Sequence, residues 1–600
     1  MNLLQRLFRR RLAPGLLTLA CAFPVSFSGQ IHLDGLFEDW SGIPANWEAP
    51  AGTTGPYTGL ALTQDAASLF LRLSLSAPVA LDETILPNAH ILLLDTDNNP
   101  ATGNNYANQG LGVDLLIHFG ARNVVRYTGN AGSSNLNSTG MLAAPTYSAQ
   151  AFEILLDREA CGLVAGNTLR ALMYHSSTGT AFPAGGATLA LTSPVAVAFA
   201  QPLERPSGTA TRVAFWNVNG RMDQPTAQAA MGRILAAVQP DILGLSEVDN
   251  MGATTVRNLL NSWMPLPDGA SWTVVKDDYD LMVASRYPIP AQFQGVTRQF
   301  PTLVTLPAPW PGPMCFVSSH LKCCGGAENE VIRQQQADEL VAFLRDTWNE
   351  NHPLWHPQSP RVYGGDLNMV GLANPILTLL TGDISDETVY GTDHAPDNDG
   401  TPWTECPALQ SDAPVDFTWG NGTGSWIPGK LDYILTSDAS AQVLHSFVLQ
   451  TQNMSVPRLF QYQLQANDAS VASDHLLVVA DLAPTTGGEG TGDLDSDGDG
   501  VLDAIDNCPN VANASQTDFN ADGLGDACSD LDGDGLSDLL EIQFFLTDPG
   551  NIDTNGNGIP DPLECLSATE GSTCTGDLNI DGVVSIADLL TLLGLFGTPC

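Results

Sequence analysis

The chain has 600 residues, too many for one hydrophobic core, and 43% of them are hydrophobic, so we expect three or four globular domains. The formal net charge is −43, from 66 acidic and 23 basic residues, which argues against a surface that binds polyanions in general. The basic residues are unevenly spread, and none follows Arg458.

Residues 1–28 have the pattern of a signal peptide. Arginines at positions 6 and 9–11 precede an apolar run over 12–25, and small residues follow it. The run is short for a membrane anchor, and nothing comparable follows. We therefore expect a secreted or surface-associated protein. Ten of the 11 cysteines lie after the run, an even number in an oxidising setting.

Residues 30–200 predict an antiparallel β-sandwich. Short alternating runs such as 69–75 and 90–94 are separated by clusters of Gly, Asn and Pro. Asp95 and Asp97 lie in an Asx-rich stretch that fits either a Ca²⁺ site or an ordinary hairpin turn. With the earlier Asp-Gly and Asp-Trp pairs, this pattern resembles carbohydrate-binding family 9 domains and DOMON modules. The resemblance identifies no ligand, and contact with a polysaccharide or a cell surface, through this part or through the C-terminal repeats, stays open.

After a polar linker at 201–210, strands alternate with helices, which predicts an α/β domain over 210–484. Apolar residues at helical spacing predict helices over 224–239 and 330–345. Apolar and β-branched runs predict strands over 213–217, 240–245, 282–289, 314–320, 431–435 and 476–480.

Polar side chains follow several of these strands where each strand ends. They are Asn217, Glu247, His320, Asp366 with Asn368, and Asp474 with His475. Asp366 and Asn368 close the run Val-Tyr-Gly-Gly-Asp-Leu-Asn, and residues two apart on an extended segment point to the same side. Ligands of α/β sheets gather at strand ends, so we expect these side chains to share one site.

These motifs, in this order, resemble the endonuclease/exonuclease/phosphatase superfamily. Leu367 stands where Phe is commoner, and Ser246 precedes Glu247 where Gln is usual, but neither change removes a functional group. The resemblance implies an α/β four-layer sandwich, in which two β-sheets are flanked by helices, and hydrolysis of phosphate esters.

The resemblance also implies a role for each residue. Glu247 would be the main metal ligand, assisted by Asn217, with Asp474 as a second carboxylate on the metal side. Oxygen ligands suit Mg²⁺, and Mn²⁺ or Ca²⁺ would also serve. His475 would act as general base or bind the phosphate, with Asp432 fixing its tautomer.

Three further residues complete the predicted site. Asp366 would orient or deprotonate the attacking water, or contact a metal. Asn368 would hold the phosphate, and His320 would contact it or protonate the leaving group. Cys323-Cys324, just after His320, is no zinc signature, because a second pair at ligand spacing is missing; we expect one of the two to pair with Cys315 or Cys406.

From Asp493 the chain becomes strongly acidic. Carboxylates alternate around glycines, so residues 493–565 would repel and stay disordered without cations but fold with Ca²⁺. The candidate ligands are Asp495, Asp497, Asp499, Asp518, Asn520, Asp522, Asp530, Asp532, Asp534, Asp553, Asn555 and Asn557. The pattern resembles thrombospondin type 3 repeats, which implies a Cys508–Cys528 disulfide.

Residues 575–600 contain an EF-hand-like loop followed by a short apolar helix. Ligands fit positions 1, 3, 5, 9 and 12 of the loop, with Asp in place of Glu at the last. They are Asp577, Asn579, Asp581, Ser585 and Asp588. The segment resembles one half of a dockerin, which normally has two copies. Partner binding, a structural calcium terminus and surface attachment all stay open.

Together these features predict a secreted, calcium-stabilised, metal-dependent phosphohydrolase. Cleavage of phosphodiester bonds in nucleic acid is the first choice, although the acidic surface opposes it. The alternative enzyme is a sphingomyelinase-like or inositol-phosphate phosphodiesterase or phosphatase. A calcium-dependent surface adhesin is the alternative without catalysis. An adhesin has no use for five of the polar residues together, which are Glu247, Asp366, Asn368, Asp432 and His475.

Overall fold

The computed structural model describes residues 31–485, except 41–42, 44–46, 51–53, 82–88, 195–198 and 421, together with 508, 525, 527–529 and 549–554. The chain divides into two compact units, Met1–Thr486 and Gly487–Cys600. The predicted signal peptide, the EF-hand segment and every candidate calcium ligand of the tail except Asp553 lie outside the described residues.

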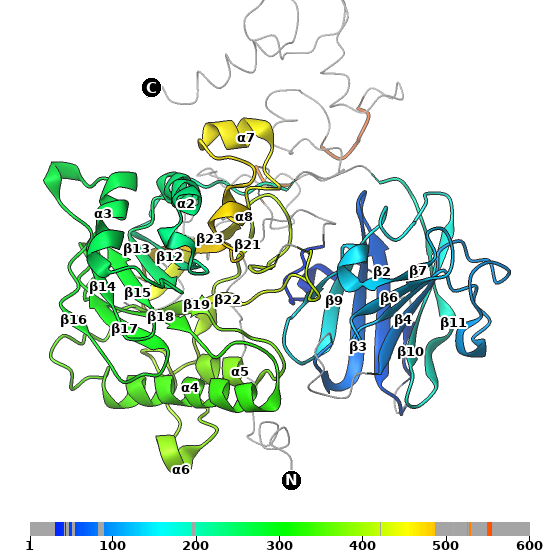
Figure 1. Ribbon diagram of the computed structural model, residues 1–600, viewed down its shortest axis with the longest axis horizontal. Coiled ribbons are helices and arrows are strands. Elements are labelled where there is room, and N and C mark those ends of the chain that lie inside the picture. Colours follow the sequence, from blue (N-terminus) through cyan, green and yellow to red (C-terminus); the bar gives the residue numbers. More distant parts are fainter. Residues whose placement is uncertain are drawn as a thin grey trace, which may run out of the picture. The chain divides into compact units, whose positions relative to one another are not determined.

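The N-terminal part of the first unit contains two sheets in which every described pairing is antiparallel (Figure 1). The first sheet has the order β1 (Trp47–Glu48), β2 (Tyr57–Gln64), β3 (Ser68–Val79), β9 (Ala149–Asp157), β8 (Leu142–Ala144). The second has the order β11 (Thr180–Ala190), β10 (Thr168–His175), β4 (His90–Asp95), β5 (Leu115–His118), β6 (Asn123–Arg126), β7 (Gly132–Asn135).

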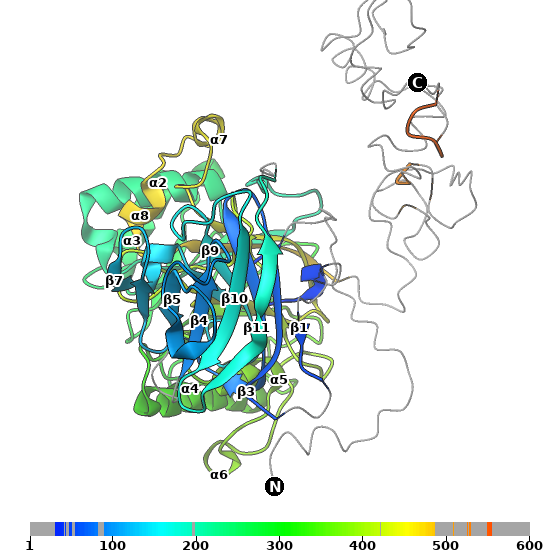
Figure 2. The same cartoon turned by 90° about the vertical axis from the view of Figure 1, so that its right-hand side faces the viewer.

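Alternation along the strands builds the core between these two sheets. Leu69, Leu71 and Leu73 of β3 point to one side because successive side chains of a strand alternate. They share one buried cluster with Leu92 and Leu94 of β4 in the other sheet. Figure 2 faces the second sheet, in which β10 and β11 run side by side.

Two further sheets follow the linker. The first has the order β14 (Thr273–Lys276), β15 (Met282–Ser285), β13 (Ile242–Ser246), β12 (Thr211–Asn217), β24 (Leu477–Pro484), β23 (Ala441–Leu449), β21 (Leu409–Gln410). The second has the order β16 (Ala291–Gln292), β17 (Gln299–Val304), β18 (Met314–His320), β19 (Arg361–Asp366), β22 (Asp432–Thr436), β20 (Thr404–Glu405).

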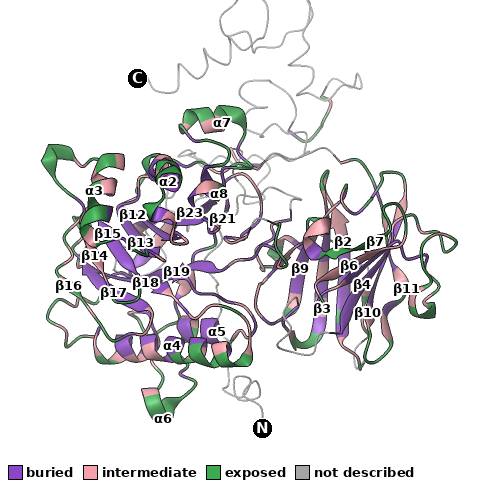
Figure 3. Cartoon of the chain, in the orientation of Figure 1, coloured by how far each residue is buried: buried purple, intermediate pink, exposed green. Residues whose placement is uncertain are grey.

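These two sheets pack face to face. Phe215 of β12 and Phe316 of β18 stack at the centre, with ring centroids 4.7 Å apart. The outer face of the first sheet packs against α2 (Pro225–Val238), α3 (Ala253–Trp263) and α8 (Asp468–Ala472). The outer face of the second packs against α4 (Ala327–Asp346) and α5 (Asn374–Thr381). Most residues of the central strands are buried, as Figure 3 shows.

The remaining helices are short. They are α6 (Glu387–Tyr390), α7 (Val456–Gln461) and the 3-10 turns η1 (Glu38–Trp40), η2 (Tyr106–Asn108), η3 (Leu136–Thr139), η4 (Arg221–Asp223) and η5 (Pro267–Gly269). Among the described residues, no helix has both the length and the apolar character needed to cross a bilayer.

The predicted strand over 282–289 is too long. β15 ends at Ser285, whose Oγ accepts a hydrogen bond from the backbone N–H of Tyr287 at 2.9 Å and turns the chain. Pro288 follows and has no N–H to continue the ladder. The predicted helices over 224–239 and 330–345 correspond to α2 and α4, and α4 begins three residues earlier than the pattern predicts.

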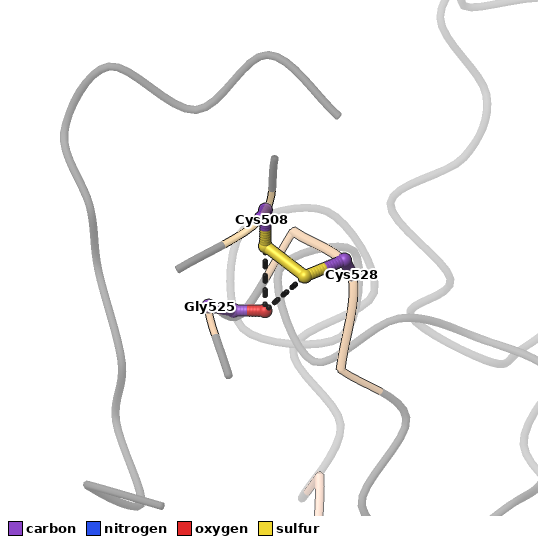
Figure 4. The surroundings of a disulfide bond; sticks show 3 residues. All are labelled: Cys508, Gly525 and Cys528. Carbon is purple, nitrogen blue, oxygen red and sulfur yellow. Dashed lines mark hydrogen bonds between the residues drawn. A yellow bond between two sulfur atoms is a disulfide. The ribbon is translucent and has the colours of Figure 1, made fainter. Parts of the chain in front are cut away.

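The second unit contains a disulfide between Cys508 and Cys528, with the two Cα atoms 5.8 Å apart. Its sulfur atoms lie 3.2 and 3.4 Å from the carbonyl oxygen of Gly525 (Figure 4). The disulfide that the resemblance to thrombospondin repeats implies is therefore confirmed.

Candidate active site

Strand register brings the predicted site residues to one end of the stacked sheets. β12 and β13 are parallel, so Asn217 ends its strand beside Ser246, directly before Glu247. β18 and β19 are also parallel, and they pair His320 with Asp366. The antiparallel partner β22 begins with Asp432 opposite Asp366.

Asn217 connects the two sheets at this end. Its side chain is fully buried, and its Nδ2 donates hydrogen bonds to Oε1 of Glu247 at 2.9 Å and to Oδ2 of Asp366 at 3.0 Å. The backbone N–H of Asn219 donates to its Oδ1 at 2.9 Å, which orients the amide group. The Asn217 amide thereby bonds both the Glu247 carboxylate, which follows a strand of the first sheet, and the Asp366 carboxylate of the second sheet.

His475 and Asp432 form a buried pair. Nδ1 of His475 lies 2.8 Å from Oδ2 of Asp432, and its Nε2 lies 3.7 Å from Oδ2 of Asp366. Burial lowers the pKa of His475, but the carboxylates of Asp432 and Asp366 outweigh burial and raise that pKa to about 10. In this arrangement the imidazole is cationic at neutral pH.

Thr418 is a site residue that the sequence analysis missed. Its hydroxyl donates to Oδ2 of Asp432 at 2.7 Å and accepts the backbone N–H groups of Asp432 at 2.9 Å and Leu431 at 3.0 Å. It therefore fixes the carboxylate that contacts His475. A lone threonine before a tryptophan carries no signal that would have identified it.

His320 lies between two carboxylates. Its Nε2 is 3.6 Å from Oε1 of Glu247 and 3.6 Å from Oδ2 of Asp366. Burial lowers its pKa to about 4, against the opposing effect of Asp366. His320 is therefore neutral at pH 7, in contrast to His475.

Glu247 and Asn368 have left-handed backbone conformations, with φ of +54° and +51°. Such angles are uncommon for residues other than glycine, and they concentrate at functional sites. Asn368 is held there by its own N–H, which donates to Oδ1 of Asp366 at 3.0 Å, and by its Nδ2, which donates to the carbonyl of Leu321 at 3.2 Å. The Glu247 carboxylate thereby reaches Asn217 and the cluster, and the N–H of Asn368 holds Asp366.

The Gly364-Gly365 pair allows β19 to pass through the centre of the site. A Cβ on Gly364 would lie 2.6 Å from the carbonyl oxygen of Tyr433 and 2.7 Å from the ring of Phe215. Gly365 has a φ of +123°, and its Cβ would lie 2.2 Å from the carbonyl oxygen of Ser319. Both glycines are therefore required by close packing inside a strand.

The site is rich in potential metal ligands. Ligand atoms of Glu247, His320 and Asp366 lie within 4.8 Å of one another, and so do those of Asp366, Asp432 and His475. Burial raises the pKa of both Glu247 and Asp366, and the charge of His475 opposes this shift only in part. This concentration of carboxylate oxygens fits a divalent cation such as Mg²⁺ or Mn²⁺.

Asp474 lies beside this cluster and outside its two ligand groups. Its Oδ2 accepts a hydrogen bond from the indole N–H of Trp419 at 3.3 Å. Its Oδ1 is buried and has no hydrogen-bond partner among the described residues. An oxygen in that state is a suitable acceptor for a cation or for a water bound to one.

The prediction that Cys323 or Cys324 pairs with Cys315 or Cys406 is wrong. Cys323 and Cys324 are free thiols whose sulfur atoms lie 2.7 Å apart. Cys315 is buried on β18 against α4, whereas Cys406 is buried between the two sheets. Cys315 lies near the start of β18, whereas Cys323 and Cys324 lie in the loop after its end at His320.

Asp95, Asp97 and Asp114 also bring ligand atoms within 4.8 Å of one another. The backbone N–H of Asn99 donates to Oδ1 of both Asp95 and Asp97 at 3.0 Å. These bonds are those of the Asx-rich turn that the sequence analysis gives as one alternative.

Two stacked sheets with helices outside carry a buried cluster of carboxylates and histidines at one end, an arrangement that fits a hydrolase domain of the phosphoesterase class. Residues 214–475, less than half of the chain, match the model of the Endonuclease/Exonuclease/phosphatase family. Residues 488–516 and 517–541 match the thrombospondin type 3 repeat. No curated protein matches the sequence.

Solved structures with a similar fold include a humanised TDP2 of D. rerio, with 13% identity, a TM-score of 0.29, and coverage of 45% of this chain and 98% of that one. The catalytic domain of human Nocturnin with bound sulfate has 16% identity, a TM-score of 0.30, and coverage of 46% and 94%. Sphingomyelinase C from Streptomyces griseocarneus has 17% identity, a TM-score of 0.27, and coverage of 46% and 99%.

Proposed function

We propose that this protein is a secreted, divalent-metal-dependent phosphohydrolase that cleaves phosphodiester bonds, with nucleic acid as the first substrate. The proposal is carried by two linked groups: Glu247 and Asp366, which accept hydrogen bonds from Asn217, and the His475–Asp432 pair, whose imidazole lies 3.7 Å from Asp366. It combines oxygen ligands, a buried carboxylate and an oriented histidine, which are the groups that phosphoester hydrolysis needs.

Glu247 and Asn217, with Asp474 at the side, would hold Mg²⁺ or Mn²⁺. A bound divalent cation supplies neutralisation of the charge that develops on the phosphate. The fit rests on the crowded, raised-pKa carboxylates and on the buried Oδ1 of Asp474.

Asp366 is the group we assign to the attacking water. Its Oδ1 accepts from the N–H of Asn368 and its Oδ2 accepts from Asn217, so the carboxylate is fixed in direction. Asp366 is almost fully buried, and burial raises its pKa, which makes it a stronger base than an exposed aspartate.

The two histidines would take different roles. Nδ1 of His475 is committed to Asp432, so the Nε2–H of the cationic imidazole is the group available to bind a phosphate oxygen. His320 is neutral at pH 7, and a neutral imidazole suits phosphate contact better than protonation of a leaving group. Asn368 would hold the phosphate beside them.

A specific feature favours a lipid phosphodiesterase of the sphingomyelinase-like kind as the second candidate. Val456 and Phe460, four residues apart on α7, are 79% and 87% exposed. Residues at that spacing share one face of a helix, and exposed apolar faces of this kind suit a lipid interface. An inositol-phosphate phosphodiesterase or phosphatase is the variant of this candidate that acts on a water-soluble substrate. A surface adhesin, the alternative without catalysis, would leave the buried cluster of carboxylates and histidines unused.

The other parts of the chain would stabilise and locate the enzyme. Residues 493–565 and 575–600 would bind Ca²⁺ through the acidic residues named above. Residues 30–200 would form a sandwich that contacts a polysaccharide or cell surface. An open cavity of about 1150 Å³ in that part is lined by Arg126, Asn130, Asn137 and Asp157 among others.

The test is a substrate panel. Purified protein is incubated with Mg²⁺ or Mn²⁺ and with plasmid DNA, RNA, sphingomyelin, an inositol phosphate and a phosphomonoester, beside the His475→Ala variant. Turnover of a nucleic acid that the variant lacks supports the first candidate, and turnover of sphingomyelin alone supports the second. No turnover of any substrate, or turnover unchanged by the substitution, contradicts the enzyme assignment.

A further inference from the structure

A short segment of the N-terminal part lies against the candidate active site. It is Thr146–Ser148, between β8 and β9, and it contacts two loops of the hydrolase domain. The hydroxyl of Thr146 donates to the carbonyl of Lys430 at 3.1 Å and accepts the N–H of Lys430 at 3.0 Å. The N–H of Ser148 donates to the carbonyl of Gly371 at 2.6 Å, and its Oγ accepts the N–H of Ala373 at 3.2 Å.

Both loops lead directly to site residues. Lys430 lies two residues before Asp432, and Gly371 lies three residues after Asn368. The contact is close, because a Cβ on Gly429 would lie 2.9 Å from the side chain of Thr146. One short segment therefore fixes the backbone on either side of the cluster.

The first of these loops is a hairpin over 418–430, and its tip is also held by the N-terminal part. Nδ2 of Asn137 donates to the carbonyls of Gly424 and Trp426, both at 2.8 Å. The Arg122 guanidinium lies 3.7 Å from the centre of the Trp426 ring. Ile427 is 6% exposed and belongs to the hydrophobic core between the two N-terminal sheets.

The stem of the hairpin contains groups that orient the histidine. Thr418 bonds the carboxylate of Asp432 through its hydroxyl and accepts the N–H of Leu476 at its carbonyl, at 2.7 Å. Trp419 pairs with Gly429 across the hairpin and donates to Asp474. Displacement of the hairpin would thus move both Asp432 and the backbone next to His475.

We propose that Thr146 and Ser148 are positioning residues for the hydrolysis, so that the N-terminal part holds the catalytic loops in place. The inference rests on the proposed function, because the reaction it affects is the one assigned above. Loops rich in glycine and polar residues, such as 420–429, have little intrinsic order, and a misplacement of about 1 Å at a catalytic group costs roughly 100-fold in rate. Hydrogen bonds from the short connection between β8 and β9 supply the missing order.

The test compares Thr146→Val, which keeps the side-chain shape but removes both hydrogen bonds, with Thr146→Ser, which restores the hydroxyl. Ser148→Ala and the double variant extend the series. Thr178→Val is the matched control, because its exposed hydroxyl bonds within the β10–β11 turn. For the full chain we measure kcat, KM, the pH dependence of kcat, and hydrogen exchange of amides in 367–373 and 418–430.

Thr146→Val is expected to lower kcat about tenfold and to shift its pH dependence, with KM changed less than about twofold. The same variant should speed amide exchange in both loops, Thr146→Ser should restore wild-type values, and Thr178→Val should change neither quantity. Unchanged kcat and exchange in the double variant, or an equal loss in Thr178→Val, overturns the inference.

If the wild-type protein turns over no substrate of the panel, the proposed function fails, and the exchange data decide the inference alone. Faster exchange confined to the two loops then supports their positioning by Thr146 and Ser148. Unchanged exchange overturns it.

Discussion

Nδ1 of His475 lies 2.8 Å from Oδ2 of Asp432, and both side chains are buried at the end of the stacked sheets. Asp432 therefore determines which nitrogen of the imidazole faces the site. Its carboxylate also accepts the hydroxyl of Thr418, so the orientation of the histidine depends on both ends of the 418–430 hairpin.

The first prediction concerns this pair. Asp432→Asn is expected to lower kcat at least about 100-fold, because an amide neither fixes the imidazole tautomer nor stabilises its charge. Steady-state kinetics on the best substrate of the panel measures the effect. Asp412→Asn, which alters a carboxylate paired with Arg458, is the control and should keep nearly full activity.

The second prediction concerns the metal. Chelation with EDTA is expected to abolish turnover, and Mg²⁺ or Mn²⁺ should restore it. Glu247→Gln should weaken Mn²⁺ binding at least tenfold by removing a charged oxygen ligand, which calorimetric titration measures. Glu204→Gln, at a carboxylate that accepts the Tyr462 hydroxyl, should bind Mn²⁺ as the wild type does. Equal affinity in Glu247→Gln would remove this residue from the metal site.

The third prediction concerns packing at the centre of the site. Gly364→Ala is expected to lower the free energy of unfolding by about 1–3 kcal/mol, because the new methyl group would overlap the Tyr433 carbonyl and the Phe215 ring. Chemical denaturation measures the loss. Gly55→Ala is the control, since a Cβ there meets nothing within 4 Å. A variant as stable as the wild type would show that β19 shifts freely.

The fourth prediction concerns pH. Burial, together with the neighbouring carboxyl of Asp438, raises the pKa of Asp397 from 3.8 to about 7. The uncharged form is therefore favoured by folding, so its stabilisation is complete below pH 3.8 and is lost as the pH rises through 7.

The Asp397→Asn side chain does not ionise, so the variant does not lose this stabilisation as the pH rises. Relative to the wild type, the variant should gain roughly 3 kcal/mol in the free energy of unfolding between pH 4 and pH 8. Thermal denaturation across that range measures it. Asp399→Asn, at an exposed carboxylate of the same turn, is the control. A stability difference that does not change with pH contradicts the assignment.

The fifth prediction concerns the acidic C-terminal repeats. Titration of the chelated protein with Ca²⁺ is expected to change the far-ultraviolet circular dichroism, because bound cations remove the repulsion between carboxylates. Reduction of the Cys508–Cys528 disulfide should weaken the apparent Ca²⁺ affinity. Mg²⁺ at the same concentration is the control, and an identical response to both ions would argue against specific calcium sites.

Much of the hydrolase fold is predictable from the sequence, because its central strands are continuous apolar runs that end in polar residues. Parallel pairing then places the ends of adjacent strands together, which is why Asn217 and Glu247, or His320 and Asp366, are neighbours. Helices with a clear apolar stripe are predictable for the same reason.

Contacts made by irregular segments are not predictable in this way. Thr418 acts through a hydroxyl on a hairpin stem, and no periodicity or spacing connects it to Asp432 in the sequence. Tertiary distance likewise decides that Cys323 and Cys324 do not pair with Cys315 or Cys406. The hydrogen bonds between Thr146 and Lys430 join segments 284 residues apart, a contact that composition alone does not reveal.

The burial of Ile427 in the hydrophobic core of the N-terminal part has a practical consequence for the design of shorter fragments. Cutting the chain in the 201–210 linker, where the sequence suggests a clean boundary, would uncover Ile427 and the face of Trp426 that Arg122 covers. An isolated hydrolase fragment would then display an apolar hairpin beside its own catalytic opening and would tend to aggregate. The smallest well-behaved fragment is therefore expected to begin near residue 31 and to keep both parts.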